Sequence, residues 1–448
     1  MKSIRFIHTA DLHLGSPLKS IGQASESIRQ ALLSASFRTL TRIVDVAIEE
    51  AVDFILIAGD LYDSEARSIQ ANKRIADEMA RLHEQNISAF IIAGNHDPIG
   101  KSSSEAIRLP ENTVIFSSES VETHEVFNDD KLIARVLGQS YRGTSDNRKM
   151  YSGYTVPDTS VWNIGLLHTA LNEQATNYVP CTKDDLRSKD DIHYWALGHI
   201  HQQQIIQDHS PVIAYPGIPQ GRDVGEPGAG SVLLVELSDN VVPDIRSIPV
   251  GEIMWREESI NIGDASFGDV ETLDDLVIFM QEYAENRMSD QRVEESENNA
   301  RYSSENRGMI VRWHITGRGN IHSTLAGDRI ESAEYISNEL RNRLYKLSPF
   351  LWTESVQIHT GPKLPALQEL ASDYEFFEFL QSVIDEIKNA ESIPGDVEKN
   401  LGKIWDASMD MEDPDEDRFL LSENILKDFL DDAEQRVIAA ILAKREDL

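Results

Sequence analysis

Seven side chains that could hold metal ions follow directly after short apolar runs of the sequence. The runs at 4–8, 53–58, 89–93, 162–167 and 194–198 are each followed within three residues by Asp, Asn or His. The set comprises Asp11, His13, Asp60, Asn95, His168, His199 and His201. Carboxylate and amide oxygens mixed with imidazoles, without sulfur, suit Mn²⁺, Fe²⁺ or Zn²⁺ better than Mg²⁺ alone or Ca²⁺. Seven ligands are too many for one ion, so the pattern predicts two divalent ions that share a carboxylate.

Such a pair of ions predicts phosphoryl-transfer chemistry. Two ions about 3.5–4 Å apart can generate a hydroxide and stabilise both the attacking and the leaving oxygen. His96 follows the candidate ligand Asn95 and is surplus to the seven, so we predict that it donates a proton or stabilises charge. Its neighbour Asp97 is predicted to orient a metal-site histidine. Asp60 is the candidate bridging ligand, because it is the only carboxylate that ends an apolar strand after a glycine.

The apolar runs have the length of buried strands, and helical patterns lie between the first three. Apolar residues recur at helical spacing over 26–52 and 68–85. Strand, helix, strand, helix, strand is the beginning of a parallel α/β fold, in which such runs deliver their ligands to one edge of the sheet. Residues 112–138 lack a helix and predict a second, more antiparallel sheet. We expect this catalytic domain to occupy 1–250.

Two further regions follow. Residues 251–362 predict a separate small α/β unit, with helices at 271–288 and 332–347 and a loop or disordered stretch at 290–307. Residues 363–448 predict an acidic helical region, in which 365–448 carries 23 acidic and 8 basic residues. Its last predicted helix, 422–443, continues an apolar stripe that could pack on the chain's own body or on a partner: Leu420, Ile425, Phe429, Ala433, Val437 and Ile441.

Composition limits the function classes. The 448 residues carry a formal charge of −34, which favours solubility and repels polyphosphate at long range. A single cysteine, Cys181, excludes a disulfide framework and fits a reducing compartment. No apolar run approaches the roughly 18 residues of a membrane span, so we expect a cytoplasmic protein that does not bind a membrane.

Candidate substrate-binding residues lie in two loops. Arg142 belongs to the tyrosine-rich loop 139–160, which could hold a nucleic-acid backbone or could be an ordinary solvated loop. Tyr215 and Arg222 lie in or next to a Gly/Pro-rich loop that we expect near the same sheet edge.

The ligand motifs resemble those of a known superfamily. Asp11-x-His13, Gly59-Asp60, Gly94-Asn95-His96-Asp97, His168 and Gly198-His199-x-His201 match, in order, the motifs of the calcineurin-like metallophosphoesterases. The opening His8-Thr9-Ala10-Asp11-Leu12-His13-Leu14-Gly15 resembles the DNA-repair exonuclease branch of that superfamily, which includes SbcD-type nuclease subunits and YhaO-type proteins.

The resemblance implies a two-sheet sandwich flanked by helices, with a dinuclear site that is usually activated by manganese. By resemblance, one ion is bound by Asp11, His13 and His201, the other by Asn95, His168 and His199, and Asp60 bridges them. His96 would be the general acid or the histidine that stabilises the transition state, and residues 251–362 would be a capping domain. The implied cofactors are two divalent ions, Mn²⁺ first and Fe²⁺ or Zn²⁺ as alternatives. The implied partners are DNA and, through the C-terminal helices, an SMC-like coiled-coil ATPase; a homodimer stays open.

Departures from the family pattern keep alternatives open. Some members place a histidine three residues after the bridging aspartate, where this chain has Asp63, so exonuclease and endonuclease action both remain open. Asp97 in place of glutamate argues against the protein-phosphatase branch. The favoured hypothesis is a metal-dependent DNA nuclease that works with an ATPase. The alternatives are a small-molecule or cyclic-nucleotide phosphodiesterase of the same fold and a non-catalytic interaction subunit.

Overall fold

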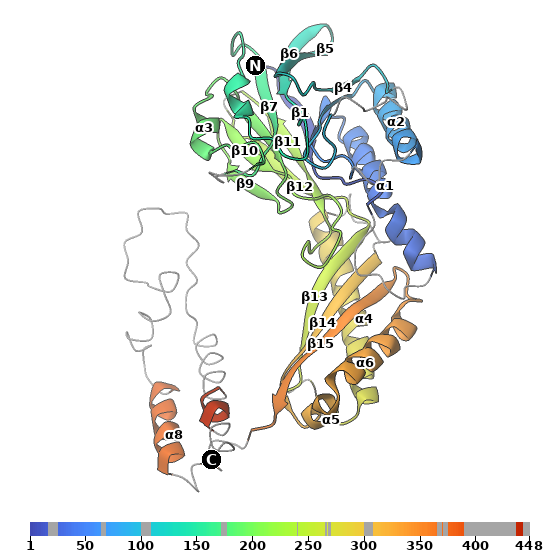
Figure 1. The fold of residues 1–448 in the computed structure, drawn as a ribbon, viewed down its shortest axis with the longest axis vertical. Helices are drawn as coiled ribbons and strands as arrows, with labels where there is room; N and C mark the ends of the chain where they lie inside the picture. The colour runs from blue at the N-terminus through green and yellow to red at the C-terminus, as the bar shows by residue number, and fades with distance from the viewer. Residues whose placement is uncertain are drawn as a thin grey trace. The chain divides into compact units, whose positions relative to one another are not determined.

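The computed structural model (Figure 1) divides into two compact units. The first comprises 1–260, 272–315 and 328–358, and the second comprises 261–271, 316–327 and 359–448. The structure describes residues 1–16, 26–63, 69–99, 109–171, 177–239, 241–264, 267, 270–299, 308–364, 370, 375–388 and 436–441. The sequence-derived domain boundaries near 250 and 362 stay a prediction.

The first sheet has the strand order β12-β11-β1-β2-β3-β4. Four strands are parallel, namely β1 (Ile4–Thr9), β2 (Phe54–Ala58), β3 (Ser88–Ile92) and β4 (Thr113–Ile115). Two antiparallel strands, β11 (Ser231–Leu237) and β12 (Asp244–Pro249), complete the sheet beside β1. The parallel strands run in one direction because helices α1 (Glu26–Glu49) and α2 (Ile69–Glu84) make the crossovers.

The second sheet has the order β5-β6-β7-β8-β10-β9. Its strands are β5 (Glu122–Asn128), β6 (Lys131–Gly138), β7 (Trp162–His168), β8 (Tyr194–Gly198), β9 (Gln204–Gln207) and β10 (Val212–Tyr215). For residues 112–138, the predicted antiparallel pairing is confirmed for β5 and β6 but is wrong for β4, which pairs parallel with β3 in the first sheet. In the rest of the second sheet, β6, β7, β8 and β10 are parallel, and the edge strand β9 is antiparallel to β10. The turn η2 (Met150–Gly153) and helix α3 (Lys183–Arg187) lie in the connections.

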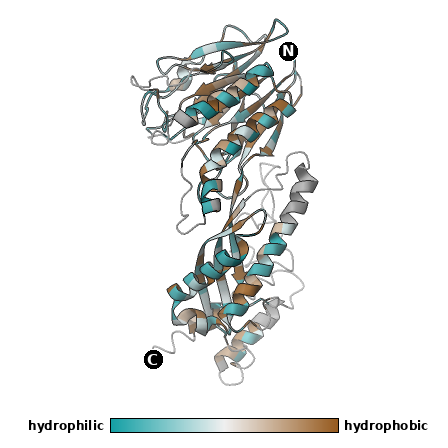
Figure 2. Cartoon of the chain, turned by 90° about the vertical axis from the view of Figure 1, so that its right-hand side faces the viewer, coloured by the Kyte–Doolittle hydropathy of each residue, from teal (hydrophilic) through white to brown (hydrophobic). Residues whose placement is uncertain are grey.

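Successive side chains of a strand point to opposite faces of its sheet, so each strand contributes to two separate hydrophobic cores. In β2, Phe54 and Leu56 face the second sheet, whereas Ile55 and Ile57 belong to the core shared with α1 and α2. The rings of Phe6 and Phe54 stack 5.1 Å apart between the sheets. Figure 2 views the helix layer from outside, where hydrophilic residues are prominent on the helices. The expected two-sheet sandwich flanked by helices is therefore confirmed.

A three-stranded sheet follows, with the order β13-β14-β15. Its elements are β13 (Ile253–Asn261), α4 (Leu273–Asn299), β14 (Gly308–Gly319), α5 (His322–Gly327), α6 (Arg329–Leu344) and β15 (Leu351–Pro362). The strand at 253–261 was not predicted. The loop predicted at 290–307 is wrong for residues 290–299, because α4 continues to Asn299.

The tail contributes α8 (Glu375–Lys388) and helical residues 436–441. Phe377 of α8 and Ile438 are buried together with Leu370. Of the predicted apolar stripe, Ile441 packs against this cluster, whereas the acidic break at 410–417 and the stripe residues from Leu420 to Ala433 lie outside the described residues. Among the helices that the structure describes, none has the length and apolar character needed to cross a bilayer.

Candidate metal centre

All seven predicted ligands lie at the carboxyl ends of strands from the two sandwiched sheets. Asp11 and His13 follow β1, Asp60 follows β2 and Asn95 follows β3. His168 is the last residue of β7, and His199 and His201 follow β8. The two sheets therefore bring together side chains that are up to 190 positions apart in the chain.

The loops that carry the ligands adopt an unusual backbone conformation. Asp11, His13, Asp60 and His199 have φ values of 54°, 44°, 52° and 99°, in the left-handed region that non-glycine residues seldom occupy. Backbone hydrogen bonds hold the first two, since Asp11 N donates to Gly59 O at 3.0 Å and His13 N donates to Asp60 O at 3.0 Å. Local strain of this kind persists only where surrounding contacts stabilise it, and it concentrates at functional sites.

The first group of ligand atoms comes from Asp11, His13 and His201, and these atoms all lie within 4.8 Å of one another. The Nε2 atoms of His13 and His201 are 3.4 Å apart. On the opposite side of each ring, Nδ1 of His13 is 2.7 Å from Asp63, and Nδ1 of His201 is 2.6 Å from Glu226. A carboxylate can only accept, so we assign the proton to both Nδ1 atoms, which leaves two Nε2 lone pairs facing each other.

The second group surrounds Asn95. Its Oδ1 lies 3.0 Å from His168 Nε2 and 3.1 Å from His199 Nδ1. Nδ1 of His168 is 2.9 Å from the Ala58 carbonyl, to which it donates, so in the neutral ring, the form that binds a metal ion, Nε2 carries the lone pair toward the amide oxygen. Asp60 Oδ2 is 3.4 Å from the same Nε2, and Asp11, Asp60 and His168 form a second set of close ligand atoms. The carboxylates of Asp11 and Asp60 thus both lie close to the second group. The role of Asp60 as the bridging ligand stays a prediction.

The facing lone pairs show whether the site suits divalent ions. Two acceptor nitrogens 3.4 Å apart repel each other unless a cation or a proton lies between them. The same holds for Asn95 Oδ1 and His168 Nε2. Oxygen and imidazole donors in this number fit two borderline or hard divalent ions, and His13, His168 and His201 are each oriented by an acceptor behind the ring.

The site also concentrates negative charge in a buried space. Burial raises the pKa of Asp11, and it would raise that of Asp60, but His168 beside Asp60 holds the pKa of Asp60 below its usual range. Burial opposes a charge on His168, yet Asp60 and Asp11 outweigh it and raise the pKa of His168 to about 9. Burial and the charge of His168 lower the pKa of His199 to about 4. The carboxylates therefore attract a cation to the site.

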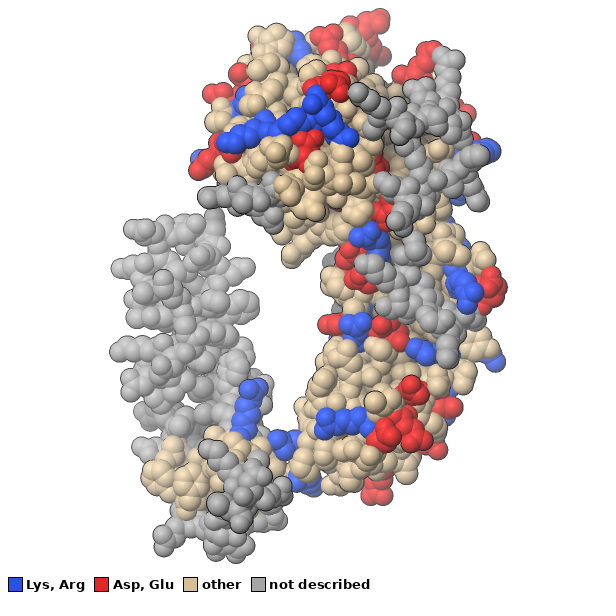
Figure 3. Space-filling view, in the orientation of Figure 1, with Lys and Arg blue, Asp and Glu red and all other residues tan. Residues whose placement is uncertain are grey.

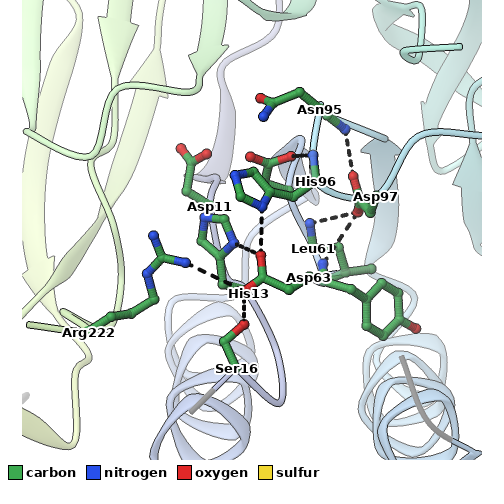
Figure 4. A network of polar contacts seen from close by, with 12 residues as sticks. Asp11, His13, Ser16, Leu61, Asp63, Asn95, His96, Asp97 and Arg222 are labelled. Atoms are coloured by element: carbon green, nitrogen blue, oxygen red, sulfur yellow. Dashed lines mark hydrogen bonds and ion pairs between the residues drawn. The ribbon is translucent and has the colours of Figure 1, made fainter. Parts of the chain in front are cut away.

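His96 lies beside the first group with its side chain 45% exposed. Its backbone N donates to Asp60 Oδ1 at 2.8 Å, and its ring meets the His13 ring edge-on with centroids 4.8 Å apart. Its Nδ1 is 2.8 Å from Asp63 Oδ1, and this hydrogen bond raises the pKa of His96 (Figure 4). The ring is thus placed at the edge of the candidate site and is favoured in its protonated form.

Asp97 supports backbone in this structure. Its carboxylate accepts from Gly94 N at 2.7 Å, Leu61 N at 2.8 Å and Tyr62 N at 3.4 Å. These bonds tie the loop after β3 to the loop after β2 (Figure 4). The predicted role of Asp97 as a partner of a histidine ring stays a prediction, whereas its observed contacts position the two ligand-bearing loops.

The predicted substrate-binding residues lie in three different surroundings. The guanidinium of Arg142 donates to Ser118 O at 3.2 Å and forms an ion pair with Glu119 at 2.9 Å. Tyr215 is buried, and its hydroxyl donates to Thr169 O at 2.8 Å. Of the three, only Arg222 lies among the site residues, 3.6 Å from Asp63 and 3.7 Å from Glu226. Direct substrate contact by these residues stays a prediction, and burial makes it difficult for Tyr215.

Three residues near the ligands were not assigned a role from the sequence. Asp63 was noted only as a departure from the family pattern, and Glu226 was not noted at all. Tyr178 lies with its ring 4.8 Å from the ring of His199 and is 37% exposed. Glu226 contacts His201 across 25 positions of a Gly/Pro-rich loop, so no local spacing could have indicated it.

Comparisons with known proteins agree with this geometry. Residues 4–203, which include all seven predicted ligands, match the family described as calcineurin-like phosphoesterases. Residues 269–361 match the middle domain of the metallophosphoesterase YhaO. Among solved structures, a dimetal phosphatase from Danio rerio aligns with a TM-score of 0.35 and 14% identity over 55% of this chain and 96% of that one.

Curated relatives give closer matches. The metallophosphoesterase YhaO of Bacillus subtilis is 34% identical over 267 residues, which cover 59% of this chain and 65% of YhaO. The DNA double-strand break repair protein Mre11 of Archaeoglobus fulgidus is 26% identical over 296 residues, 61% of this chain and 62% of that protein. The matched regions cover less than two thirds of these relatives. The chain thus carries a calcineurin-like metallophosphoesterase domain followed by a YhaO-type middle domain, and it is homologous to YhaO and to Mre11 proteins.

Proposed function

We propose that this metallophosphoesterase is a dinuclear-metal-dependent phosphodiesterase that cleaves DNA in repair. One observation carries the proposal: two groups of imidazole and oxygen donors face inward at one sheet edge, with the Nε2 atoms of His13 and His201 3.4 Å apart. Two divalent ions bound there would lower the pKa of water and neutralise charge on a phosphodiester. Because imidazoles and carboxylates are mixed without sulfur, we propose Mn²⁺, with Fe²⁺ or Zn²⁺ as alternatives.

The residues of this chain then have separate tasks. The two ligand groups would hold the two ions, whose positive charge would attract the substrate phosphate to that side of the site. His96, at the exposed edge of the site, holds a proton that the leaving oxygen needs when the ester bond breaks. The tie between the two ligand loops through Asp97 keeps Asp60 and Asn95 in register.

Similarity to Mre11 proteins supports DNA as the substrate. The formal charge of −34 argues against tight DNA binding by the isolated chain. However, residues 365–448 carry 23 acidic and 8 basic residues, and thus a net −15 of that charge. In Figure 3 acidic and basic side chains are interspersed over the described surface that faces the viewer. The part of the chain that carries the site is therefore less repulsive to DNA than the total charge implies.

Incubation of the purified protein with Mn²⁺ and an end-labelled linear duplex tests the proposal. We expect metal-dependent cleavage that EDTA abolishes, and hydrolysis of bis-p-nitrophenyl phosphate under the same conditions. The distribution of labelled products separates exonuclease from endonuclease action. Hydrolysis of the small diester without any cleavage of DNA would reject DNA as the substrate and retain the phosphodiesterase.

One cavity favours the alternative of a nucleotide-sized substrate. A cavity of about 600 Å³ borders His201 and Glu226, and its walls are largely glycine and proline, with Gln202 and Gln203 as polar groups. Among the residues that line it, Glu226 is acidic and none is Lys or Arg, which suits a nucleoside better than a second phosphate. A cyclic nucleotide assayed beside the duplex therefore distinguishes the two candidates, since the alternative requires faster turnover of the cyclic nucleotide than of DNA.

We also propose that the tail binds an SMC-like coiled-coil ATPase. On α8, Phe377 is buried against Ile438, whereas Phe376 and Phe379 are 53% and 67% exposed. An amphipathic helix with exposed aromatic residues suits a hydrophobic groove on a partner. Formation of a homodimer and a cytoplasmic location stay predictions from the sequence.

A further inference from the structure

A glutamine side chain is held in one orientation beside the candidate metal centre. Gln203 lies two positions after the predicted ligand His201, and both residues border the cavity of about 600 Å³. Its Oε1 accepts from the hydroxyl of Ser231 on β11 at 2.8 Å and from the hydroxyl of Ser247 on β12 at 2.7 Å. Two hydroxyl groups of the first sheet therefore orient an amide that belongs to the loop after β8.

These two hydrogen bonds determine what the amide can offer to a ligand. The carbonyl oxygen of a glutamine has two lone pairs, and the two serine hydroxyls use both of them. The Nε2 group carries two N–H donors, and none of the described residues accepts from it. Gln203 therefore presents hydrogen-bond donors, and no acceptor, at the wall of the cavity.

The other polar side chains at the cavity already have partners. Glu226 accepts from His201 Nδ1 at 2.6 Å and from the backbone N of Arg222 at 2.7 Å, with one bond on each carboxylate oxygen. Gln202 Oε1 lies 3.5 Å from Gln204 Nε2. Glycine, alanine, proline and isoleucine form most of the remaining wall. Mostly apolar walls with one oriented polar group are typical of a cavity that binds a small ligand specifically.

We propose that this cavity receives the nucleobase next to the phosphate bound at the metal centre, and that Gln203 donates a hydrogen bond to a carbonyl oxygen of that base. This inference rests on the proposed phosphodiesterase function. His201 is both a candidate ligand and part of the cavity wall, so a base in the cavity lies beside a phosphate at the site. The flat, largely apolar faces of a base suit the glycine- and proline-rich walls.

The occupied lone pairs of Gln203 predict which bases bind. Glutamine usually recognises adenine through both amide atoms, one as donor and one as acceptor. Here the serine hydroxyls already occupy Oε1, so this paired contact is excluded. An amino group of a base that faced Nε2 would place donor against donor and lose its hydrogen bond to water. A carbonyl oxygen at the same position accepts from Nε2, which favours uracil, thymine and guanine over cytosine and adenine.

A base that enters the cavity must leave the stack of a duplex. The cost of unstacking is smallest for a base that is already single-stranded or unpaired. The cavity therefore suits the base at a frayed or single-stranded DNA end, and it equally suits the base of a free nucleotide.

Two diesters with the same leaving group test for the base site. Deoxyuridine 5′-(p-nitrophenyl phosphate) carries a base, whereas methyl p-nitrophenyl phosphate carries none, and both are assayed under saturating Mn²⁺. We expect Gln203→Ala to lower the ratio of their kcat/KM values by about 3- to 10-fold, because one hydrogen bond to the base is lost. The loss should lie in KM for the deoxyuridine ester, since the base is remote from the bond that breaks.

Gln204→Ala is the matched control, because it removes the same side chain from the next position, which does not border the cavity. We expect that variant to keep the wild-type ratio. Gln203 is exposed, so its replacement should not unfold the protein. An unchanged ratio in Gln203→Ala, or an equal loss in Gln204→Ala, would overturn the proposal.

Base preference tests the direction of the hydrogen bond. The deoxyuridine and deoxycytidine esters have nearly the same shape and differ at position 4, where one has a carbonyl and the other an amino group. We expect the wild type to prefer the deoxyuridine ester by about 3- to 10-fold, and we expect Gln203→Ala to lose the preference. Equal kcat/KM values for the two esters, or a preference for deoxycytidine, would reject Gln203 as the donor to the base.

The serine hydroxyls provide a second, independent variant. Ser247→Ala frees one lone pair of Gln203 Oε1, so the amide can turn and accept from an amino group. We expect the preference for the deoxyuridine ester to fall in that variant. Ser238→Ala, beyond the other end of β11, removes a hydroxyl that donates to Ser3 and should keep the preference. An unchanged preference in Ser247→Ala would show that the serine does not orient the amide.

A binding measurement without turnover separates this proposal from the proposed function. Isothermal titration of Zn²⁺-loaded protein compares deoxyuridine 5′-monophosphate with deoxyribose 5-phosphate, which lacks the base. We expect the nucleotide to bind more tightly, and we expect Gln203→Ala to reduce that difference by about 3- to 10-fold. If the wild type hydrolyses neither diester, the proposed function fails, while this comparison still decides whether the base binds. Equal affinity of the wild type for the two ligands rejects the base site, even if both diesters are hydrolysed.

Discussion

Asp60 connects segments from three strands through one side chain. Its Oδ1 accepts from the backbone N of His96 at 2.8 Å, and its Oδ2 lies 3.4 Å from His168 Nε2. It follows β2 directly, and His96 and His168 come from β3 and β7. A substitution of Asp60 is therefore expected to disturb the positions of ligands in both groups.

We predict that Asp60→Asn loses bound metal and phosphodiesterase activity together. The amide keeps the shape of the side chain but removes the negative charge that would attract and bridge the ions. We expect a loss of activity larger than the roughly 10- to 100-fold that follows from changing partners of metal ligands. Elemental analysis and turnover of bis-p-nitrophenyl phosphate measure the effect. Asp77→Asn, at an exposed ion pair on α2, is the control. Two bound ions and near wild-type turnover in Asp60→Asn would contradict the assignment.

For His96 we predict a loss of rate without a loss of metal. The ring lies outside both groups of predicted ligands, so His96→Ala should still bind two ions. General acid catalysis contributes about 10²- to 10⁴-fold, and we expect the rate on DNA to fall by that amount. His209→Ala, on an exposed loop, should leave the rate unchanged. Loss of an ion in His96→Ala would show instead that His96 is a ligand.

At the scale of elements, close approach between the loops after β2 and β3 builds the site. A Cβ added to Gly94 would lie 2.2 Å from Asp60 Oδ1 and 2.8 Å from Asp60 Cγ. A Cβ added to Gly59 would lie 2.2 Å from His168 Nδ1. The glycines before Asp60 and Asn95 are therefore required by the packing of neighbouring loops at the sheet edge, in addition to any need for a sharp turn.

We predict that Gly94→Ala displaces Asp60 and weakens metal binding. The added methyl group cannot fit without a shift of the carboxylate or of the loop, which we expect to lower the free energy of unfolding by about 1–3 kcal/mol. Isothermal titration with Mn²⁺ and thermal unfolding of the metal-free protein measure the two effects. Gly327→Ala is the control, because a Cβ there meets no atom within 4 Å. Unchanged Mn²⁺ affinity in Gly94→Ala would show that the loop can move without consequence.

At the scale of the whole molecule, the two sandwiched sheets and the tail have separate hydrophobic clusters. Leu370, Phe377 and Ile438 form the buried part of the tail cluster, and Leu364, Leu380 and Ile441 pack against it. All members of the hydrophobic clusters in the two sandwiched sheets lie between residues 4 and 250. Within the described residues, the tail cluster and these sheet clusters share no member.

We therefore predict that deletion of residues 366–448 abolishes association with the ATPase and leaves hydrolysis of a small diester intact. A pull-down with the ATPase and an assay with bis-p-nitrophenyl phosphate measure the two properties. The double change Phe376→Asp and Phe379→Asp in the full chain is a milder test, because both side chains are exposed and their loss should not unfold α8. If the truncated chain is inactive or unfolded, the tail belongs to the protein's own core and the partner proposal loses its support.

The sequence alone determined the parts of this protein that depend on local pattern. The strands that carry the ligands and the helices α1 and α2 were predicted within a few residues, because a buried strand is a continuous apolar run and a surface helix has an apolar period near 3.6. The candidate ligands could be named because each follows such a strand at once. Short edge strands were missed; β5, for example, has one buried residue among seven, so its apolar signal is weak.

Only the tertiary structure decided what lies behind the ligands. Asp63 meets His13 across 50 positions and Glu226 meets His201 across 25, through loops that have no periodic pattern. The direction of the strands in the second sheet likewise depends on how each connection crosses, which the strand sequences do not encode. Contacts of this kind arise when separate loops reach one sheet edge, so side-chain packing in three dimensions determines them, and the spacing of residues along the chain does not.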